Sequence, residues 1–165
     1  MKKKSYVIAV DFDGTCTAHD FPRVGNDIGA ARVLKRLTDA GHRLILWTMR
    51  SDIDDVHHDL EDKTIHPHPG QYLTDAINWF EKNGIPLYGI QRNPTQHQWT
   101  TSPKCYAELY IDDAALGAPL AYNTEVSDRP FIDWEVVEIQ LENRGILPKT
   151  ISWQDAARAL FNSHE

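Results

Sequence analysis

Two aspartates, Asp11 and Asp13, have the spacing of a catalytic or metal-binding pair. They follow residues 6–10, a continuous apolar run that predicts a strand covered on both faces. Side chains at i and i+2 of an extended segment point the same way, and Gly14 then lets the backbone turn out of the sheet. Carboxylates this close repel one another, so the pair either shares a cation or holds one proton at neutral pH. Both states are useful in catalysis.

A second acidic pair, Asp112 and Asp113, follows another apolar run. Thr48 likewise follows the apolar run at residues 43–47. Open α/β sheets bind ligands beyond the carboxyl ends of their strands, so we expect these side chains to meet the first pair in one cleft. So many carboxylates could not all stay ionised unless a hard divalent cation lay among them. Mg²⁺ fits, because it keeps several waters and a substrate phosphate oxygen in its shell.

Three further polar side chains could bind a substrate phosphate in this cleft. Lys104 would supply a positive charge and Thr48 a hydroxyl donor, so that charge developing in an in-line phosphoryl transfer is neutralised on several sides. Arg50 could bind a phosphate with two parallel hydrogen bonds, although an arginine that simply faces solvent after a strand is equally common. Together with the aspartates, these residues predict phosphoryl chemistry on a metal ion.

The alternation of apolar patterns predicts an α/β fold with a parallel, doubly wound sheet in three layers. Apolar runs predict strands at residues 6–10, 43–47, 87–90 and 107–111. Apolar residues at helical spacing predict helices over residues 30–37, 73–80, 134–141 and 153–160. Parallel neighbouring strands need a crossover connection, which the intervening helices supply.

The length of 165 residues suits one domain with a single core. We expect this domain to span residues 1–165, with its motif-bearing core at about 5–116 and C-terminal helices at about 133–163. No apolar stretch approaches the roughly 20 residues of a membrane span, and the first residues lack the pattern of a signal peptide, so a cytoplasmic protein is expected. The net charge of −7 disfavours binding to nucleic acid. The two cysteines, Cys16 and Cys105, are expected to be reduced.

Four motifs, in their order along the chain, resemble those of the haloacid dehalogenase-like (HAD) superfamily of aspartate-nucleophile phosphotransferases. They are Asp-Phe-Asp-Gly-Thr at residues 11–15, Thr48, Lys104, and the pair Asp112 and Asp113. The resemblance covers roughly residues 5–116 and implies a Rossmann-like core. Members that cleave carbon–halogen bonds lack an acid at the position of Asp13, and the ion-pumping ATPases carry threonine there. The resemblance therefore implies a phosphatase or a phosphomutase.

By this resemblance Asp11 is the nucleophile that takes the phosphoryl group and becomes an aspartyl-phosphate. Asp13 protonates the leaving group and then activates water, so it must be protonated when the leaving group departs. The implied ligands of Mg²⁺ are the Asp11 carboxylate, the Asp13 backbone carbonyl and Asp112. Asp113 is expected to act through water or to orient Lys104. The implied activity is that of a Mg²⁺-dependent phosphoric monoester hydrolase.

The spacing of the motifs leaves no room for the cap domain that many members carry. The site is therefore expected to be open, and either to take a bulky substrate or to be covered by a loop or by a second subunit of a homo-oligomer. Residues 51–69 are the candidate cover within the chain. They include His57, His58, His66 and His68, which we interpret as part of a solvated or lid-forming segment, because the prolyl stretch there gives a metal no fixed geometry.

The expected substrate is a phosphorylated small molecule whose identity does not follow from the motifs. A polynucleotide end-phosphatase is the runner-up, because an open site accepts large substrates, although the acidic net charge disfavours it. An alternative from another class is a receiver-like signalling module, which also combines an acidic pair, a phosphorylated aspartate, a threonine and a lysine on a parallel sheet. The order of the motifs along the chain disfavours that alternative.

Overall fold

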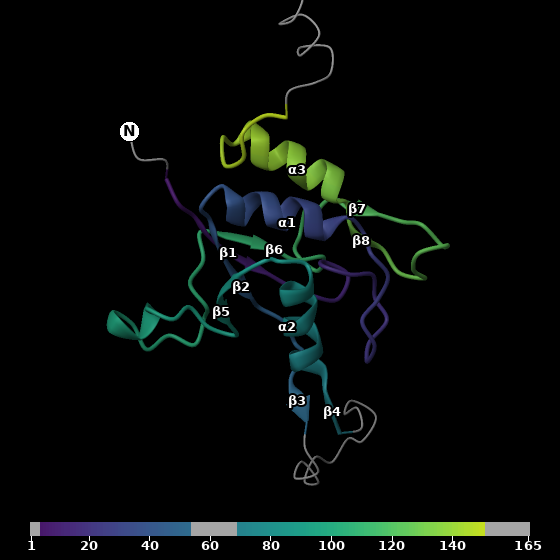
Figure 1. The fold of residues 1–165 in the computed structure, drawn as a ribbon, viewed down its shortest axis with the longest axis horizontal. Helices are drawn as coiled ribbons and strands as arrows, with labels where there is room; N and C mark the ends of the chain where they lie inside the picture. Colours follow the sequence, from purple (N-terminus) through teal and green to yellow (C-terminus); the bar gives the residue numbers. More distant parts are fainter. Residues whose placement is uncertain (1–3, 54–68, 151–165) are drawn as a thin grey trace, which may run out of the picture.

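The computed structural model describes residues 4–53 and 69–150, and its architecture is α/β (Figure 1). Four parallel strands form one sheet in the order β5-β2-β1-β6. The strands are β1 (Val7–Val10), β2 (Arg43–Leu46), β5 (Leu87–Ile90) and β6 (Leu109–Ile111). Each strand lies within an apolar run that predicts it. The structure therefore confirms an α/β fold built on a parallel sheet.

The described α-helices are α1 (Ala30–Asp39), α2 (Tyr72–Lys82) and α3 (Trp134–Asn143). Two short antiparallel pairs join β3 (Asp52–Ile53) to β4 (Gly70–Gln71) and β7 (Leu120–Ala121) to β8 (Phe131–Ile132), and η1 (Gln96–Gln98) is a single 3₁₀ turn. The three helices lie where helical spacing predicts them, whereas the helix predicted over residues 153–160 lies outside the described residues. No helix within the described ranges is long and apolar enough to cross a membrane.

Strand β1 is central and fixes the geometry of the edge where ligands would bind. Its last residue, Val10, lies opposite Leu46 of β2 and Ile111 of β6. All four of its side chains are buried, as a continuous apolar run predicts for a strand covered on both faces. Because the three strands run parallel and end in register, the residues that follow them emerge side by side.

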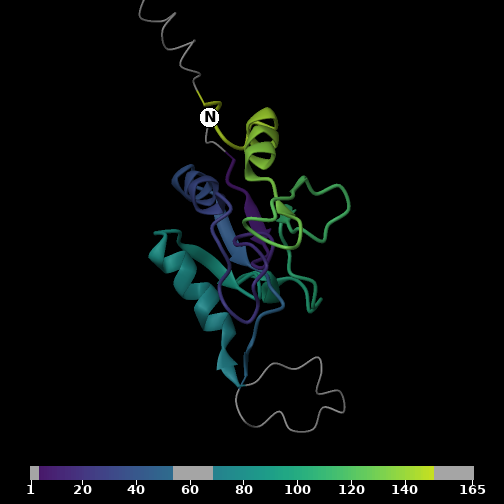
Figure 2. The same ribbon diagram turned by 90° about the vertical axis from the view of Figure 1, so that its right-hand side faces the viewer.

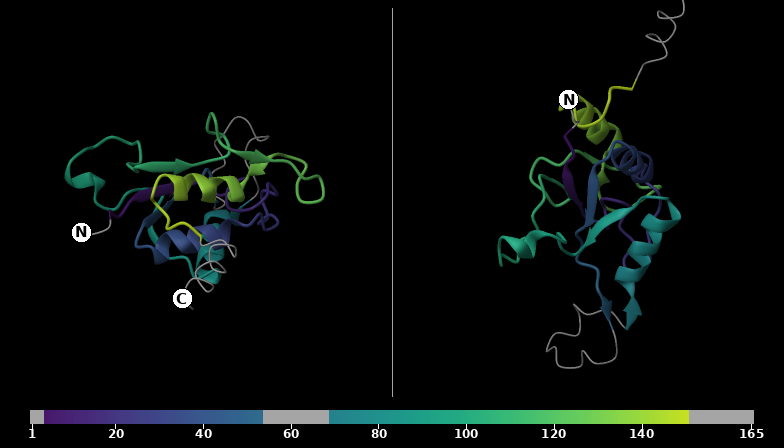
Figure 3. Two further views of the ribbon diagram at one scale, coloured as in Figure 1. Left: turned by 90° about the horizontal axis from the view of Figure 1, so that it is seen from above. Right: turned by 60° about the vertical axis from the view of Figure 1, so that its left-hand side comes forward.

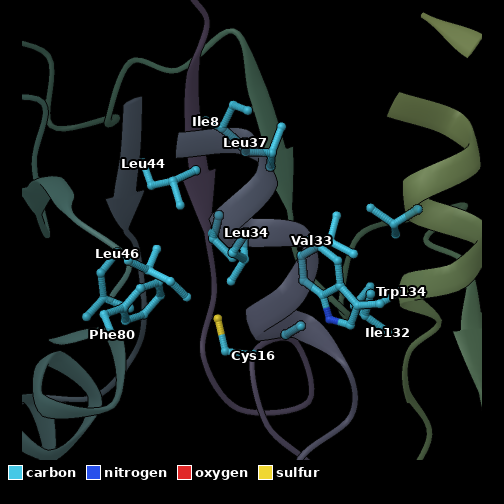
Figure 4. Close-up of a cluster of buried hydrophobic side chains, with 14 of the residues drawn as sticks. Ile8, Cys16, Val33, Leu34, Leu37, Leu44, Leu46, Phe80, Ile132 and Trp134 are labelled. Carbon is cyan, nitrogen blue, oxygen red and sulfur yellow. The ribbon is translucent and has the colours of Figure 1, made fainter. Parts of the chain in front are cut away.

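One face of the sheet packs against the helices. Ile8 and Val10 of β1 and Leu44 and Leu46 of β2 share a core with buried side chains of α1, α2 and α3 (Figure 4). Figure 2 shows α1 and α2 on the same side of the strands. The apolar stripe of α1 therefore faces the sheet, which explains its helical spacing.

The opposite face of the sheet is covered differently. Val7, Ala9 and Ile45 pack there against Cys105 and Ala107, which belong to the loop before β6. No helix of residues 4–53 and 69–150 contributes to this second cluster. The second helical layer that a doubly wound arrangement requires is therefore not among the described residues, and the three-layer arrangement stays a prediction.

Helix α3 forms ion pairs with α1 and a hydrogen bond with the turn after β1. The Arg32 and Arg36 guanidinium groups of α1 both donate to the Glu138 carboxylate of α3, and Figure 3 shows the two helices side by side. At the start of α3, the buried Trp134 indole N–H donates to the Thr15 carbonyl at 2.7 Å. Helix α3 therefore supports the turn that carries the first acidic motif.

We expect Trp134→Phe to lower the free energy of unfolding by about 1–3 kcal/mol, because the Thr15 carbonyl would stay buried without its donor. Chemical denaturation followed by circular dichroism would measure the loss. Trp99→Phe is the matched control, since Trp99 is 61% exposed, and it should change the stability by less than about 0.5 kcal/mol. Equal losses in the two variants would contradict a specific role for the Trp134 hydrogen bond.

Candidate functional site

Three carboxylates gather where β1 and β6 end. Asp11, Asp112 and Asp113 each offer one oxygen, and these oxygens all lie within 4.8 Å of one another. The Asp11 backbone N–H donates to the Ile111 carbonyl at 3.0 Å, which extends the pairing of the two strands into the site. The structure thus brings together the two acidic motifs that are separated by about a hundred residues in the sequence.

The position of Asp11 strongly changes the pKa of its carboxyl group. The pKa of Asp11 is raised from 3.8 to about 7, and burial is the largest cause. The charges of Asp112, Asp113 and Asp13 contribute to this rise, and a hydrogen bond from the Phe12 backbone N–H opposes it. Asp11 therefore takes up a proton near neutral pH unless a cation stabilises its charge.

Asp113 is held by two side chains from the turn after β1. His19 Nε2 lies 3.0 Å from Asp113 Oδ2, and the Thr15 hydroxyl accepts from the Asp113 backbone N–H at 3.0 Å. Gly14 makes this close approach possible, because its φ is +79° and a Cβ there would lie 2.2 Å from His19 Nε2 and 2.8 Å from Asp113 Oδ2. Asp113 is therefore fixed in direction before any ligand binds.

Asp13 is engaged by Arg50 and does not join the other three acids. The Arg50 Nε and Nη2 groups donate to the two Asp13 carboxylate oxygens, each at 2.7 Å. The remaining Arg50 N–H groups donate to the backbone carbonyls of Pro22, Arg23 and Tyr72. With its side chain only 1% exposed, Arg50 has all five N–H donors in use.

This arrangement corrects two predictions. Arg50 was a candidate phosphate ligand, but no donor of its guanidinium is left for a phosphate. Asp13 is expected beside the other carboxylates, yet its carboxylate pairs with the Arg50 guanidinium. Arg50 lies inward because the loop after β1 and the start of α2 surround it with carbonyl oxygens, and because the rings of Phe12 and Phe21 lie 4.9 and 5.2 Å from its guanidinium carbon.

A hollow of about 440 Å³ lies beside Asp11 at the ends of the strands. It is lined by Asp11, Trp47, Thr48, Met49, Gln91 and Asp112. The Thr48 hydroxyl accepts from the Arg50 backbone N–H at 3.2 Å, so its own hydrogen is available to a ligand. Thr48 therefore lies where the sequence predicted a hydroxyl donor.

Gln91, which no motif singled out, fixes the backbone of Thr48. Its side-chain oxygen accepts from the Thr48 N–H at 3.1 Å, and its side-chain nitrogen donates to the Thr48 and Arg50 carbonyls. Among the described residues it is also the one non-glycine with a positive φ, at 56°. Such backbone conformations often accompany functional sites.

Lys104 is not brought to the hollow. Its side chain is exposed, and Nζ lies 5.9 Å from the centre of the Tyr110 ring. In the described part of the chain it forms no ion pair with Asp113, whose side-chain partners are His19 and Thr15. The prediction that Asp113 orients Lys104 therefore finds no support, because the chain before β6 directs this lysine along the face of Tyr110.

The acidic group at the ends of β1 and β6 could hold a hard divalent cation. All of its donor atoms are carboxylate oxygens, which suit Mg²⁺ and offer nothing to a softer metal. Asp11 and Asp112 are the predicted side-chain ligands, and Asp113 belongs to the same group of oxygens. The Asp13 side chain is occupied by Arg50, so its contribution would come through the backbone carbonyl.

Part of the predicted lid over residues 51–69 lies outside the described residues, together with His57, His58, His66 and His68. His19 and Gln91 were missed by the sequence analysis. His19 follows the first motif closely, but nothing in its spacing distinguishes it from a surface histidine. Gln91 follows a predicted strand, and that position was its one signal.

No protein-family model and no curated protein matches this chain. The chain does resemble the solved structure of a conserved protein from Bacteroides thetaiotaomicron, at 29% sequence identity and a TM-score of 0.61. The likeness covers 89% of this chain and 94% of that chain. It supports the architecture over nearly the whole length and assigns no activity, so the function must be argued from the site.

The raised pKa of Asp11 predicts a measurable dependence of stability on pH. A carboxyl that binds its proton more tightly in the folded state destabilises the fold as the pH rises from about 4 to about 7. In the absence of divalent metal, the difference in free energy of unfolding between Asp11→Asn and the wild type should therefore rise by about 1–4 kcal/mol in favour of the variant from pH 4 to pH 8. Urea denaturation with chelator at both pH values would measure these free energies of unfolding. Asp128→Asn, at an exposed carboxylate, should show the same pH dependence of stability as the wild type. A difference between Asp11→Asn and the wild type that does not change with pH would refute the raised pKa of Asp11.

Proposed function

We propose that the protein is a Mg²⁺-dependent phosphomonoester hydrolase that acts through an aspartyl-phosphate. The observation that carries this proposal is the position of Asp11, which lies beside Asp112 and Asp113 and lines the same hollow as Thr48. A carboxylate nucleophile, oxygen ligands for a hard cation and a hydroxyl donor are the parts that such a reaction needs.

The HAD-like motifs support the same proposal, since all four occur in order along the chain. We include in it the finer features that this resemblance implies, namely a three-layer core and the lack of a cap domain. The substrate would then be a phosphorylated molecule that reaches an open site.

In the first half-reaction an Asp11 oxygen attacks phosphorus while the bond from phosphorus to the leaving oxygen breaks. The phosphoryl group stays on Asp11 as an acyl phosphate, and the leaving oxygen takes up a proton from Asp13. The Thr48 hydroxyl donates to a phosphoryl oxygen as negative charge develops. A bound Mg²⁺, held by Asp11, Asp112 or Asp113 and the Asp13 carbonyl, would supply positive charge against the phosphate and the acids.

In the second half-reaction water attacks phosphorus and Asp13 accepts its proton, which releases inorganic phosphate and the Asp11 carboxylate. The bidentate pair with Arg50 would hold Asp13 in one fixed orientation for this task. The task of an acid in the first half-reaction needs a proton on the same paired carboxyl. The HAD resemblance implies both tasks for Asp13, and a leaving group as good as p-nitrophenolate depends little on the acid.

Purified protein with Mg²⁺ should release phosphate from p-nitrophenyl phosphate, and Asp11→Asn should lower kcat at least about a thousandfold, because the nucleophile is lost. Asp128→Asn serves as the control and should keep wild-type turnover. Turnover retained in Asp11→Asn would sink the assignment of the nucleophile. Stable phosphorylation of Asp11 by acetyl phosphate without turnover would instead identify a signalling module.

Arg50→Lys should slow hydrolysis of the aspartyl-phosphate about tenfold or more and slow its formation less, because lysine cannot form the bidentate pair. Rapid-quench kinetics would show the aspartyl-phosphate accumulating. Free guanidinium ion should partly restore the second step in Arg50→Ala.

The control for Arg50 is Arg23→Gln, because Arg23 meets Arg50 only through its backbone carbonyl. This variant should keep both rates. Equal slowing of the two steps in Arg50→Lys, without rescue of Arg50→Ala by guanidinium, would leave Arg50 with a purely structural role.

A further inference from the structure

The segment from residue 82 to residue 107 differs in charge from the rest of the chain. The whole chain has 24 acidic residues among 165, about one in seven, yet this segment has no aspartate or glutamate. It carries Lys82, Arg92 and Lys104 as cations, and His97 as a further potential one. The segment is therefore a positively charged region in a chain whose net charge is −7.

This segment encloses a cavity next to the candidate site. The cavity, of about 700 Å³, lies between β5 and the loop of residues 91–105, which carries η1 and stands out beyond β5 in Figure 1. Its lining includes Ile90, Arg92, His97, Thr101 and Ser102 and contains no acidic residue. Its volume falls within the range of pockets that take small molecules.

Two buried amide side chains fix the shape of the loop. Asn93 donates to the Tyr106 carbonyl and accepts from the Thr95 backbone N–H. Gln96 donates to the carbonyls of Ser102 and Lys104, and its oxygen accepts from the Tyr106 N–H at 2.7 Å. Both amides are more than 90% buried, so the wall of the cavity is formed before a ligand binds.

Gln91 connects this cavity to the acidic site. It lines both the cavity and the hollow that contains Asp11 and Thr48. Its side chain holds the Thr48 backbone, and its own backbone takes a left-handed conformation at the border between the two spaces. A phosphate bound at Thr48 would therefore have the cavity beside it, in reach of the rest of the substrate.

The cations of the cavity have no anionic partner among the residues that the structure describes. In the described residues neither Arg92 nor His97 forms an ion pair, whereas the helix arginines Arg32 and Arg36 are both paired with Glu138. A guanidinium without a carboxylate partner is suited to a phosphate or carboxylate of a ligand. The lining therefore favours an anionic ligand group.

We propose that this cavity binds the leaving group of the substrate and that this leaving group carries a second anionic group, a phosphate or a carboxylate, which Arg92 contacts. This substrate class rests on the proposed phosphatase function. A substrate with two anionic groups would place its reactive phosphate beside Asp11 and its second anion beyond Gln91.

Matched substrates would test the proposal. We expect kcat/KM to be at least about tenfold higher for fructose 1,6-bisphosphate than for fructose 6-phosphate, and for a nucleoside 3′,5′-bisphosphate than for the 3′-monophosphate. The same comparison of 3-phosphoglycerate with glycerol 3-phosphate tests a carboxylate as the second anion. The pair with the largest ratio identifies the source of the anion.

Arg92→Gln should remove most of this preference, chiefly through KM, and should leave the turnover of p-nitrophenyl phosphate unchanged. Arg129→Gln, at an exposed arginine outside the cavity, is the matched control and should keep the preference. A loss of p-nitrophenyl phosphate turnover in Arg92→Gln as large as the loss for the bisphosphates would overturn the proposal, since it would indicate a structural role.

Binding to the Asp11→Asn variant separates this proposal from the proposed function. With Mg²⁺ present, calorimetry should give a Kd for fructose 1,6-bisphosphate at least about tenfold lower than that for fructose 6-phosphate. Equal kcat/KM and equal Kd across all the pairs overturn the substrate class, even if p-nitrophenyl phosphate is turned over. Absent turnover with a retained difference in Kd would overturn the phosphatase function and keep the anion site.

Discussion

The mutual repulsion of Asp11, Asp112 and Asp113 is the constraint on which the rest of the structure depends. Their oxygens are held within 4.8 Å because two parallel strands end in register. The fold offsets part of this repulsion by fixing Asp113 with His19 and by letting Asp11 hold a proton near neutral pH. A bound cation would relieve the remaining repulsion among the three carboxylates, so the site would be more stable with a cation than without one.

Asp13, the fourth acid of the two motifs, lies beside a positive charge instead of beside other acids. Arg50 takes both oxygens of Asp13, and three backbone carbonyls take its other donors. The guanidinium is buried with all its donors in use, so this ion pair resists rearrangement, since breaking it would leave a buried charge without a partner. Two carboxylates only two residues apart thus have distinct environments, one beside other acids and one beside a guanidinium. Different chemical tasks follow naturally from that difference.

The sequence predicted the parts of the fold that depend on local pattern. Continuous apolar runs predicted the four strands of the parallel sheet, and helical spacing predicted α1, α2 and α3, whereas the short strands β3, β4, β7 and β8 were not predicted. The acids at the ends of β1 and β6 lie together, as their positions after apolar runs indicated. The directions of long side chains were not predictable. Arg50 lies inward because carbonyls from the loop after β1 and from the start of α2 surround it. Lys104 lies away from the acids, near the face of the Tyr110 ring. Such contacts join residues far apart in sequence, so no local spacing encodes them.

Two hydrogen bonds from the region of α3 also set the order in which the site is completed. The Ile132 N–H donates to the Gly14 carbonyl at 2.8 Å, and the Trp134 indole donates to the Thr15 carbonyl. During synthesis the turn that carries Asp11 leaves the ribosome well before residues 132–134 exist to hold it. A nascent chain shorter than this lacks both of these hydrogen bonds and keeps only those within the turn, such as the one from the Cys16 N–H to the Phe12 carbonyl. The full set of hydrogen bonds at this turn therefore forms only after the chain has been made past the start of α3.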